Sequence, residues 1–185
     1  MNSLTHLSLD ISPADPPPSL GAEPLTFLHL QTLIVSGCLA PMVLFFQRCS
    51  TPALTTLTIK ANPHASFETT PKDFMRCLEV VSQKAESRDL FRHFILHHQA
   101  SPFRESLASL SPLQALADVI SPLCTLRQME TVDLSLPLHW GLFPTHASIE
   151  EIVASWPNLR TLRVDLGRNP IIGALPLSWN LLLTV

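Results

Sequence analysis

The chain has 185 residues, a length that suits one domain with a sizeable buried core. It is 46% hydrophobic and 15% charged with a net charge of -3, which excludes a disordered chain and a polyanion binder. Seventeen prolines against five glycines predict stiff connections and exclude the glycine-rich loops that hold phosphates. The four cysteines, at 38, 49, 77 and 124, form no CxxC pair, so we expect free thiols in the cytoplasm or nucleus and no zinc site.

A short apolar pattern recurs along the chain: leucine-x-x-leucine-x-leucine, followed three positions later by a small or polar residue. Its copies begin at Leu4, Leu30, Leu54, Phe91, Met129 and Leu159, of which those at Phe91 and Met129 are weaker. The first two intervals fit the roughly 20–29 residues of a leucine-rich repeat, whereas the next two are longer and must hold extra structure. Each copy therefore predicts one short strand of a parallel sheet.

Helices are predicted between these strands. One runs from Pro41 to about Arg48. A second opens at Thr70-Pro71, where Thr70 can cap the helix and Pro71 fits its first position. Its apolar face repeats at the spacing of an α-helix and consists of Phe74, Cys77, Leu78 and Val81. Segments 10–24 and 60–70 are rich in proline or polar residues, so we expect irregular loops there.

The second half of the chain shows three further helix starts. Ser111-Pro112 and Ser121-Pro122 each lead a short apolar segment. The third is a capping box from Ser148 to Glu151, and Pro157 stops the helix that it begins. The side chains that this helix is expected to bury are Ile149, Ile152, Val153 and Trp156.

Strands that alternate with helices predict an α/β fold. We expect an irregular right-handed leucine-rich-repeat solenoid, a horseshoe arc with a parallel sheet on its concave face and helices on its convex face. The domain covers residues 1–167 as about six repeats, and residues 168–185 form an atypical apolar tail or a truncated repeat. Pro176 interrupts that tail, and it is shorter than the roughly 20 residues of a membrane span, so no membrane anchor is expected.

Two columns of side chains on the predicted strands face outward. The third pattern positions hold mainly threonine, which suits an exposed strand whether or not it binds anything. The fifth positions include Ile34 and Ile95, which indicate either a protein-binding surface or burial under a loop. The predicted contacts of a protein partner on the concave face are Thr32, Ile34, Thr56, Thr58, His93, Ile95, Thr131, Asp133, Thr161 and Arg163. The first strand adds His6 and Ser8 to the two columns.

Catalytic and metal-binding motifs are not evident. The GxSxG, P-loop and GxGxxG motifs do not occur. His93, His97 and His98 invite a metal site, but a strand separates residues four apart by about 13 Å, so we expect exposed histidines at a strand end. We therefore expect no enzymatic activity, no metal and no cofactor.

The charged residues do not point to a nucleic-acid site either. Asp133 and Asp165 lie on neighbouring predicted strands beside Arg163, and we interpret them as a solvated charge cluster. The nearest approach to a basic patch is the group Lys84, Arg88 and Arg92, which is too small to hold a nucleic acid.

Two stretches carry a resemblance to a known family. LQTLIVSGC at Leu30–Cys38, followed by Arg48-Cys49 and PALTTLTI, resembles the cysteine-containing repeats of F-box/leucine-rich-repeat proteins. Two later stretches are similar to the later repeats of the large F-box/leucine-rich-repeat families of mushroom-forming fungi. They are TLRQMETVDLSLP and SIEEIVASWPNLRTLRV. The resemblance spans roughly residues 1–167. It implies that Cys38 caps the turn after its strand and that Cys49 closes the following helix.

Members of such families are substrate receptors of cullin-based ubiquitin ligases, in which the F-box binds the adaptor and the repeats bind the protein to be ubiquitinated. No F-box precedes the strand at Leu4, so the resemblance implies adaptor binding only through an F-box outside this chain. The alternative is a scaffold for protein assembly unrelated to ubiquitin. We also expect solenoid ends without capping units, as in a fragment or a chain whose ends meet partners.

Overall fold

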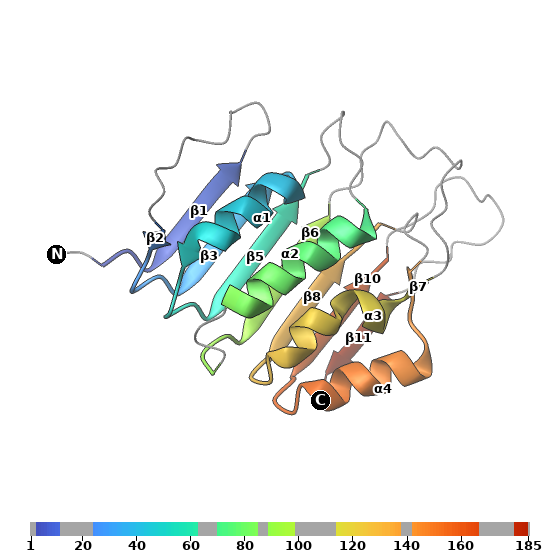
Figure 1. Cartoon of the computed structure of the whole chain (residues 1–185). Coiled ribbons are helices and arrows are strands. Elements are labelled where there is room, and N and C mark those ends of the chain that lie inside the picture. The colour runs from blue at the N-terminus through green and yellow to red at the C-terminus, as the bar shows by residue number, and fades with distance from the viewer. Residues whose placement is uncertain are drawn as a thin grey trace.

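Six parallel strands make up most of a seven-stranded sheet with the order β1-β3-β5-β6-β8-β10-β11 (Figure 1). The computed structural model describes residues 3–11, 24–62, 70–84, 89–98, 114–137, 142–166 and 180–184. The parallel strands are β1 (His6–Ile11), β3 (Thr32–Gly37), β5 (Thr56–Ala61), β6 (His93–His98), β8 (Thr131–Ser135) and β10 (Thr161–Asp165). Each begins two residues after the start of a copy of the leucine pattern, so all six predicted strands are confirmed.

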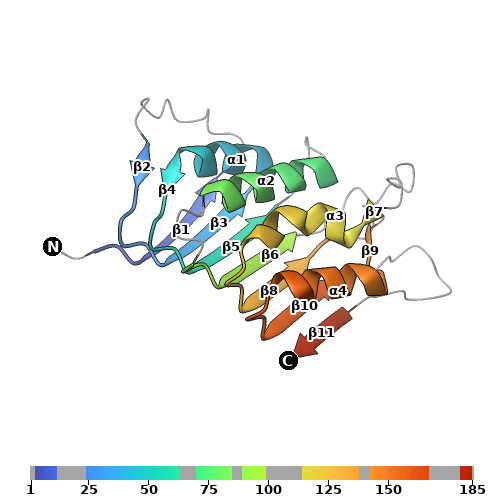
Figure 2. The same cartoon turned by 60° about the horizontal axis from the view of Figure 1, so that its bottom comes forward.

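The remaining strands were not predicted. β11 (Asn180–Thr184) lies in the apolar tail and pairs with β10 in the antiparallel direction. Two short parallel pairs stand apart from the main sheet, on its helical side (Figure 2). They join β2 (Leu25–Thr26) to β4 (Cys49–Ser50) and β7 (Gln114–Ala115) to β9 (Leu142–Phe143). The fold is thus mixed α/β with a mostly parallel sheet.

Four helices cover one face of the sheet, and no described helix covers the other face (Figure 2). They are α1 (Leu39–Arg48), α2 (Pro71–Lys84), α3 (Leu116–Ile120) and α4 (His146–Ser155). A 3₁₀ helix, η2 (Ser121–Thr125), follows α3 directly. Ser121-Pro122 thus opens a helical turn as predicted, whereas the start predicted at Ser111-Pro112 lies outside the described residues.

The core lies between the helices and the sheet. From β3 to β10, the fourth and sixth pattern positions point toward the helices and are at most 2% exposed. These side chains are Leu33, Val35, Leu57, Ile59, Phe94, Leu96, Val132, Leu134, Leu162 and Val164. Full burial of such a side chain contributes about 1.5–3 kcal/mol, so the repeated leucine pattern accounts for much of the stability. On the edge strand β1 the equivalent Leu7 and Leu9 are only half-buried.

A repeated backbone contact fixes the register of the parallel strands. The carbonyl of Thr5 accepts hydrogen bonds from the amides of Gln31 and Thr32, at 2.9 and 3.0 Å. The residue just before each following strand makes the same contact: its carbonyl accepts from two amides at the start of the next parallel strand. These residues are Gln31, Thr55, Arg92 and Glu130. Because this contact recurs at the same position, equivalent residues of all six strands lie side by side.

Helix α2 begins as predicted. The hydroxyl of Thr70 accepts a hydrogen bond from the amide of Asp73 at 3.3 Å, and the amide of Thr70 donates to the Asp73 carboxylate at 3.0 Å. This reciprocal pair is a capping box, which satisfies amides that the first turn leaves free. The predicted apolar face is also confirmed, since Phe74, Cys77, Leu78 and Val81 are all buried.

The start predicted for helix α4 is wrong by three residues. Its cap is Thr145, whose hydroxyl accepts from the Ser148 amide at 3.0 Å, and Ser148 itself is buried in the first turn. Both residues carry a hydroxyl able to cap, and packing of the helix on the core decides between them. Of the predicted inward side chains, Ile152 and Trp156 are buried.

The predicted loops and the first helix also differ at their ends. Residues 10 and 11 belong to β1 and residues 60 and 61 to β5, because the strands continue past the leucine pattern. The rest of these loops, 12–23 and 63–69, lies outside the described residues. Of the remaining loop residues, 24 precedes β2, 62 follows β5 and 70 precedes α2. Helix α1 begins at Leu39, so Pro41 falls in its first turn, where a missing amide costs nothing.

Candidate functional site

The outward side chains of the six parallel strands form one surface on the side opposite the helices (Figure 2), here called the open face. The strand register places the third pattern positions in one row and the fifth positions in another. All ten residues predicted to contact a partner lie in these two rows. They are Thr32, Ile34, Thr56, Thr58, His93, Ile95, Thr131, Asp133, Thr161 and Arg163. Their role in binding stays a prediction.

The centre of the open face is apolar. Ile34 and Ile95 lie on either side of Thr58, one strand away in each direction. Since neighbouring strands are about 4.8 Å apart, the two isoleucines are separated by about 10 Å. Both are half-buried rather than fully exposed, because residues on adjacent strands shield their flanks. The two isoleucines form an apolar strip that Thr58 interrupts, and such a strip within a polar surface is suited to contact with another protein.

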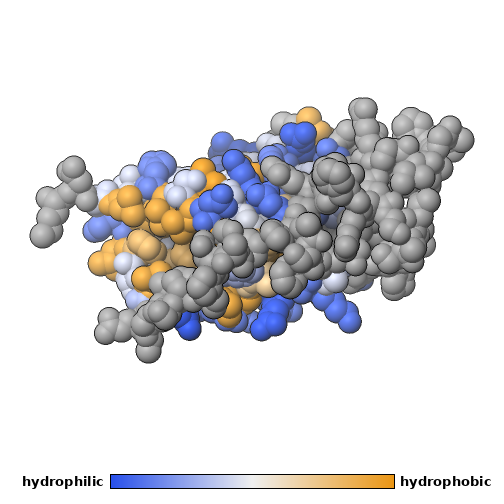
Figure 3. Space-filling model, turned by 90° about the horizontal axis from the view of Figure 1, so that it is seen from above, coloured by the Kyte–Doolittle hydropathy of each residue, from blue (hydrophilic) through white to orange (hydrophobic). Residues whose placement is uncertain are grey.

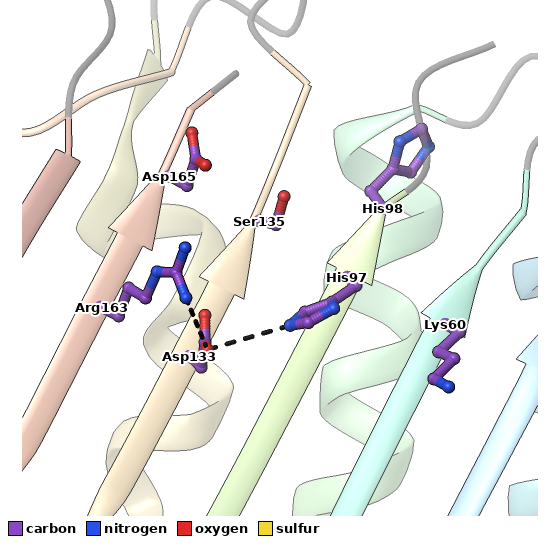
Figure 4. A pocket seen from close by; sticks show the side chains of 7 residues that line it. All are labelled: Lys60, His97, His98, Asp133, Ser135, Arg163 and Asp165. Atoms are coloured by element: carbon purple, nitrogen blue, oxygen red, sulfur yellow. Dashed lines mark ion pairs between the residues drawn. The ribbon is translucent and has the colours of Figure 1, made fainter.

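A depression of about 450 Å³ lies next to this strip, at the carboxyl ends of the strands (Figure 4). Four strands line it, with the side chains Lys60, His97, His98, Asp133, Ser135, Arg163 and Asp165. The register explains why they meet: Lys60, His97, Ser135 and Asp165 continue the outward rows by two residues. The depression thus belongs to the open face and adds charge to it.

Asp133 is the electrostatic centre of the depression (Figure 4). Its Oδ2 lies 3.7 Å from Nη1 of Arg163 and 3.9 Å from Nε2 of His97. The Asp133 side chain is 20% exposed, whereas those of Arg163 and His97 are about half exposed. Such long, partly solvated pairs contribute little to stability, as expected for the predicted charge cluster. The half-exposed side chains of Arg163 and His97 remain accessible to groups of a partner.

The histidines of β6 do not all lie where the sequence analysis placed them. His97 is exposed, His93 is half-buried and His98 is only 9% exposed, so the prediction that these histidines are exposed at a strand end is right for His97 alone. The reason is the alternation of a strand, which turns residues 94, 96 and 98 toward the helices and 93, 95 and 97 outward. Within the part of the chain that the structure describes, no three His, Cys, Asp or Glu side chains gather as metal ligands would.

A second charge cluster lies at the opposite, amino-terminal end of the strands. Glu130 Oε1 is 2.6 Å from Nη1 of Arg92, and Glu130 Oε2 is 3.9 Å from Nε of Arg160. Arg92, a member of the small basic group found in the sequence, is therefore neutralised by an acidic neighbour. Lys84 ends helix α2, and Arg88 lies outside the described residues.

The cysteine thiols are mostly buried and form no disulfides. All four thiols are free, as predicted, and those of Cys38, Cys49 and Cys77 are buried. Burial raises the pKa of Cys77 to about 12. Burial likewise raises the pKa of Cys49 to about 11, although nearby Lys84 acts in the opposite direction. Burial also raises the pKa of Cys124. These thiols are protonated at neutral pH and make poor nucleophiles.

Cys38 and Cys49 lie at the two ends of α1. The thiol of Cys38 follows β3 and donates to the carbonyl of Asn62 at 3.6 Å, which connects the exit of β3 to that of β5. Cys49 ends the helix, and its amide donates to the carbonyls of Phe45 and Phe46. Cys38 thus lies at the exit of β3, and Cys49 lies at the C-terminal end of α1.

Sequence analysis missed Lys60 and Ser135 as members of the candidate site. Both lie two residues beyond a predicted outward residue, Thr58 and Asp133 respectively, on the same face of their strands. The period of two that identified the first two rows also predicts this third row. Lys60 and Ser135 lie beyond the last apolar position of the leucine pattern, so the pattern itself does not include them.

The chain matches no model of a protein family, no curated protein and no solved structure. No helix among the described residues is both long and apolar enough to cross a membrane. The functional interpretation therefore depends on the geometry of the open face and the depression at its edge.

Proposed function

We propose that this chain is a non-catalytic protein-recognition module that binds a protein through its open face. The observation that carries the proposal is the alignment of the outward rows on six parallel strands, opposite all four helices. Alignment places an apolar strip, Ile34 to Ile95, beside the charged depression around Asp133. A strip of this kind supplies apolar contact area, and the charges around it supply specificity.

In this proposal the fold is an irregular right-handed leucine-rich-repeat solenoid with the sheet on its concave face. Three features support it: the recurring leucine pattern, the carbonyl that joins each repeat to the next, and the single helical layer. In such an array each unit contacts mainly its neighbours, which suits the repeated contacts between adjacent strands. The two long intervals of the pattern account for the irregularity.

The module acts in the cytoplasm or nucleus, without metal or cofactor. The free, protonated thiols suit a reducing compartment and offer no activated nucleophile. The acidic group at the centre of the depression, Asp133, already faces the Arg163 guanidinium and the His97 imidazole. The resemblance to F-box/leucine-rich-repeat proteins suggests that the bound protein is a substrate for ubiquitination, with the ligase adaptor bound by an F-box outside this chain.

Two substitutions on the open face test the proposal. Ile34→Glu and Ile95→Glu each place a charge in the apolar strip, and we expect both variants to lose proteins that the unchanged chain captures from a fungal extract. Leu44→Glu is a matched control, since Leu44 is 50% exposed on helix α1, on the other side of the sheet. The proposal is wrong if the two open-face variants capture the same proteins as the control.

A separate experiment addresses the link to ubiquitin. A longer product that contains an F-box together with these repeats should bring down the ligase adaptor in a co-precipitation. Failure to do so, with capture by the open face retained, would favour the scaffold for protein assembly instead.

A further inference from the structure

Strand β1 forms one outer edge of the main sheet. It pairs with β3 on one side, and no described strand pairs with its other side (Figure 1). A free edge presents a row of backbone amides and carbonyls to which another strand can bind. β1 contains no proline or lysine of the kind that often protects such an edge.

The backbone of β1 directs alternate residues outward. The carbonyl of Thr5 points to β3, because it accepts from Thr32. In a parallel pair, residues that bond to one neighbour alternate with residues that bond to the other. His6, Ser8 and Asp10 therefore direct their amide and carbonyl groups away from β3, toward the free edge.

The side chains of β1 are complementary to a second copy of the same strand. In an antiparallel pair centred on Ser8, His6 of each copy lies opposite Asp10 of the other, and Ser8 lies opposite Ser8. His6, Ser8 and Asp10 are exposed, so each His6 imidazole can bond to the opposed Asp10 carboxylate, as an ion pair where the histidine carries a proton. Their backbone groups face outward in this register, so the three opposed positions are those that exchange hydrogen bonds.

The same register also pairs apolar side chains on the helical side. Leu7 of one copy lies opposite Leu9 of the other, and both are only half-buried in the single chain. Seen from above, hydrophobic surface gathers at the end of the molecule that holds β1, β2 and α1 (Figure 3). Exposed leucines beside the strand and in the adjoining turn include Leu4 and Leu28. Pairing would continue the inward leucine rows from one sheet into the next.

We propose that two copies of this chain associate through their β1 edges, as antiparallel strands about a two-fold axis at Ser8. The occupant of the edge is a second copy because the His6–Asp10 contacts, the leucine pairing and the backbone direction all agree in a single self-complementary register. The interface is isologous, so it closes after two copies instead of forming a filament. The inference does not depend on the function proposed for the open face.

Cross-linking by cysteine tests both the interface and its register. In the proposed pair the two Ser8 Cα atoms are about 5.5 Å apart, within the range of about 4.4–6.8 Å that a disulfide requires. The two Asp10 Cα atoms are four residue steps apart along the strands, about 13 Å, which is too far. We expect mild oxidation to link Ser8→Cys chains into a dimer of twice the 20.5 kDa chain mass, and to leave Asp10→Cys chains unlinked.

A mixture of His6→Cys and Asp10→Cys chains provides a second control, since these positions are opposed only between copies. The mixture should form a linked dimer that neither variant forms alone. All of the substituted residues are exposed in the single chain, and circular dichroism checks that each variant folds. Equal linking of Ser8→Cys and Asp10→Cys would contradict the register.

Sedimentation of the unchanged chain at increasing concentration completes the test. A dimer that dissociates in Ser8→Pro, which removes an outward amide without touching the bonds to β3, supports the proposal. A monomer at every concentration overturns it. So does a dimer that persists in Ser8→Pro, because its interface then lies elsewhere, for example at β11.

Discussion

The indole Nε1 of Trp156 donates a hydrogen bond to the carbonyl oxygen of Leu123, 3.1 Å away, inside the helical layer. Trp156 directly follows α4, which leads into β10, and Leu123 lies in η2, which leads into β8. Both side chains are almost completely buried. The bond therefore links two neighbouring repeats on the side opposite Asp133 and Arg163, and it helps to hold the strands that carry these two residues.

Replacement of Trp156 by phenylalanine should destabilise the chain. The variant removes one of two donors to the Leu123 carbonyl, which still accepts from the Leu126 amide at 2.9 Å, and it also removes part of a buried ring. A hydrogen bond contributes about 0.5–1.5 kcal/mol and the smaller ring leaves a cavity, so the free energy of unfolding should fall by about 1 kcal/mol or more. Urea unfolding followed by far-ultraviolet circular dichroism measures the change. An unaltered midpoint would show that the bond does not stabilise the fold.

Gly37 allows no side chain. Its φ is +132°, and a Cβ added there would lie 2.1 Å from the carbonyl oxygen of Ile11 on the adjacent strand. Gly37→Ala should therefore lower the free energy of unfolding by about 3 kcal/mol, through backbone strain and displacement of β1. Ser36→Ala, one residue earlier on the open face, is the control and should change it by less than about 0.5 kcal/mol. Equal thermal stability of the two variants would contradict this account.

The cap of helix α4 distinguishes the structure from the sequence-based prediction. Thr145→Ala removes the hydroxyl that accepts from the Ser148 amide, and should cost about 1 kcal/mol. Glu151→Gln should have little effect, because Glu151 lies beyond the first turn instead of closing a capping box with Ser148. Chemical unfolding of both variants measures the two effects. A large loss for Glu151→Gln with none for Thr145→Ala would support the helix start at Ser148.

Buried thiols make the stability depend on alkaline pH. The pKa of Cys77 rises from an ordinary value of 9.0 to about 12, so above pH 9 the folded chain holds a proton that the unfolded chain has released. Stability is complete below pH 9 and falls as the pH rises toward 12. For this thiol the loss between pH 8 and pH 10 should be about 1 kcal/mol.

The Cys77→Ala variant isolates this contribution. It should lose less stability than the unchanged chain over the same pH interval, when urea midpoints are compared in the presence of a reducing agent. Cys49, whose pKa is also raised, still contributes in both proteins. An equal loss in the two proteins would mean that Cys77 does not titrate differently on unfolding.

The strands were predictable because local sequence determines them. Leu57 and Ile59, Val132 and Leu134, and Leu162 and Val164 alternate with polar residues, and a shift by one residue would expose them. Helix α2 was predictable for a similar reason, since Thr70 and Pro71 mark its start within the sequence. The apolar period and the caps act over a few residues, and the structure agrees with both.

The features that were missed depend on packing between distant segments. β11 pairs with β10 although nothing in its short apolar sequence specifies a partner or a direction. The depression requires four strands to end at the same level, so only the register shows that Lys60 and Arg163 line the same depression. The alternation of side chains along a strand predicts that His98 is buried, but the polar run His97-His98 favoured the interpretation of an exposed strand end.

The most direct test of the central claim is to find which side of the sheet touches a bound protein. A photo-cross-linking amino acid can be placed at Thr58, at the centre of the open face, or at Leu44, on the helical side. With a protein captured by the chain present, the account predicts a covalent adduct from position 58 and none from position 44. An adduct from position 44 alone would contradict it.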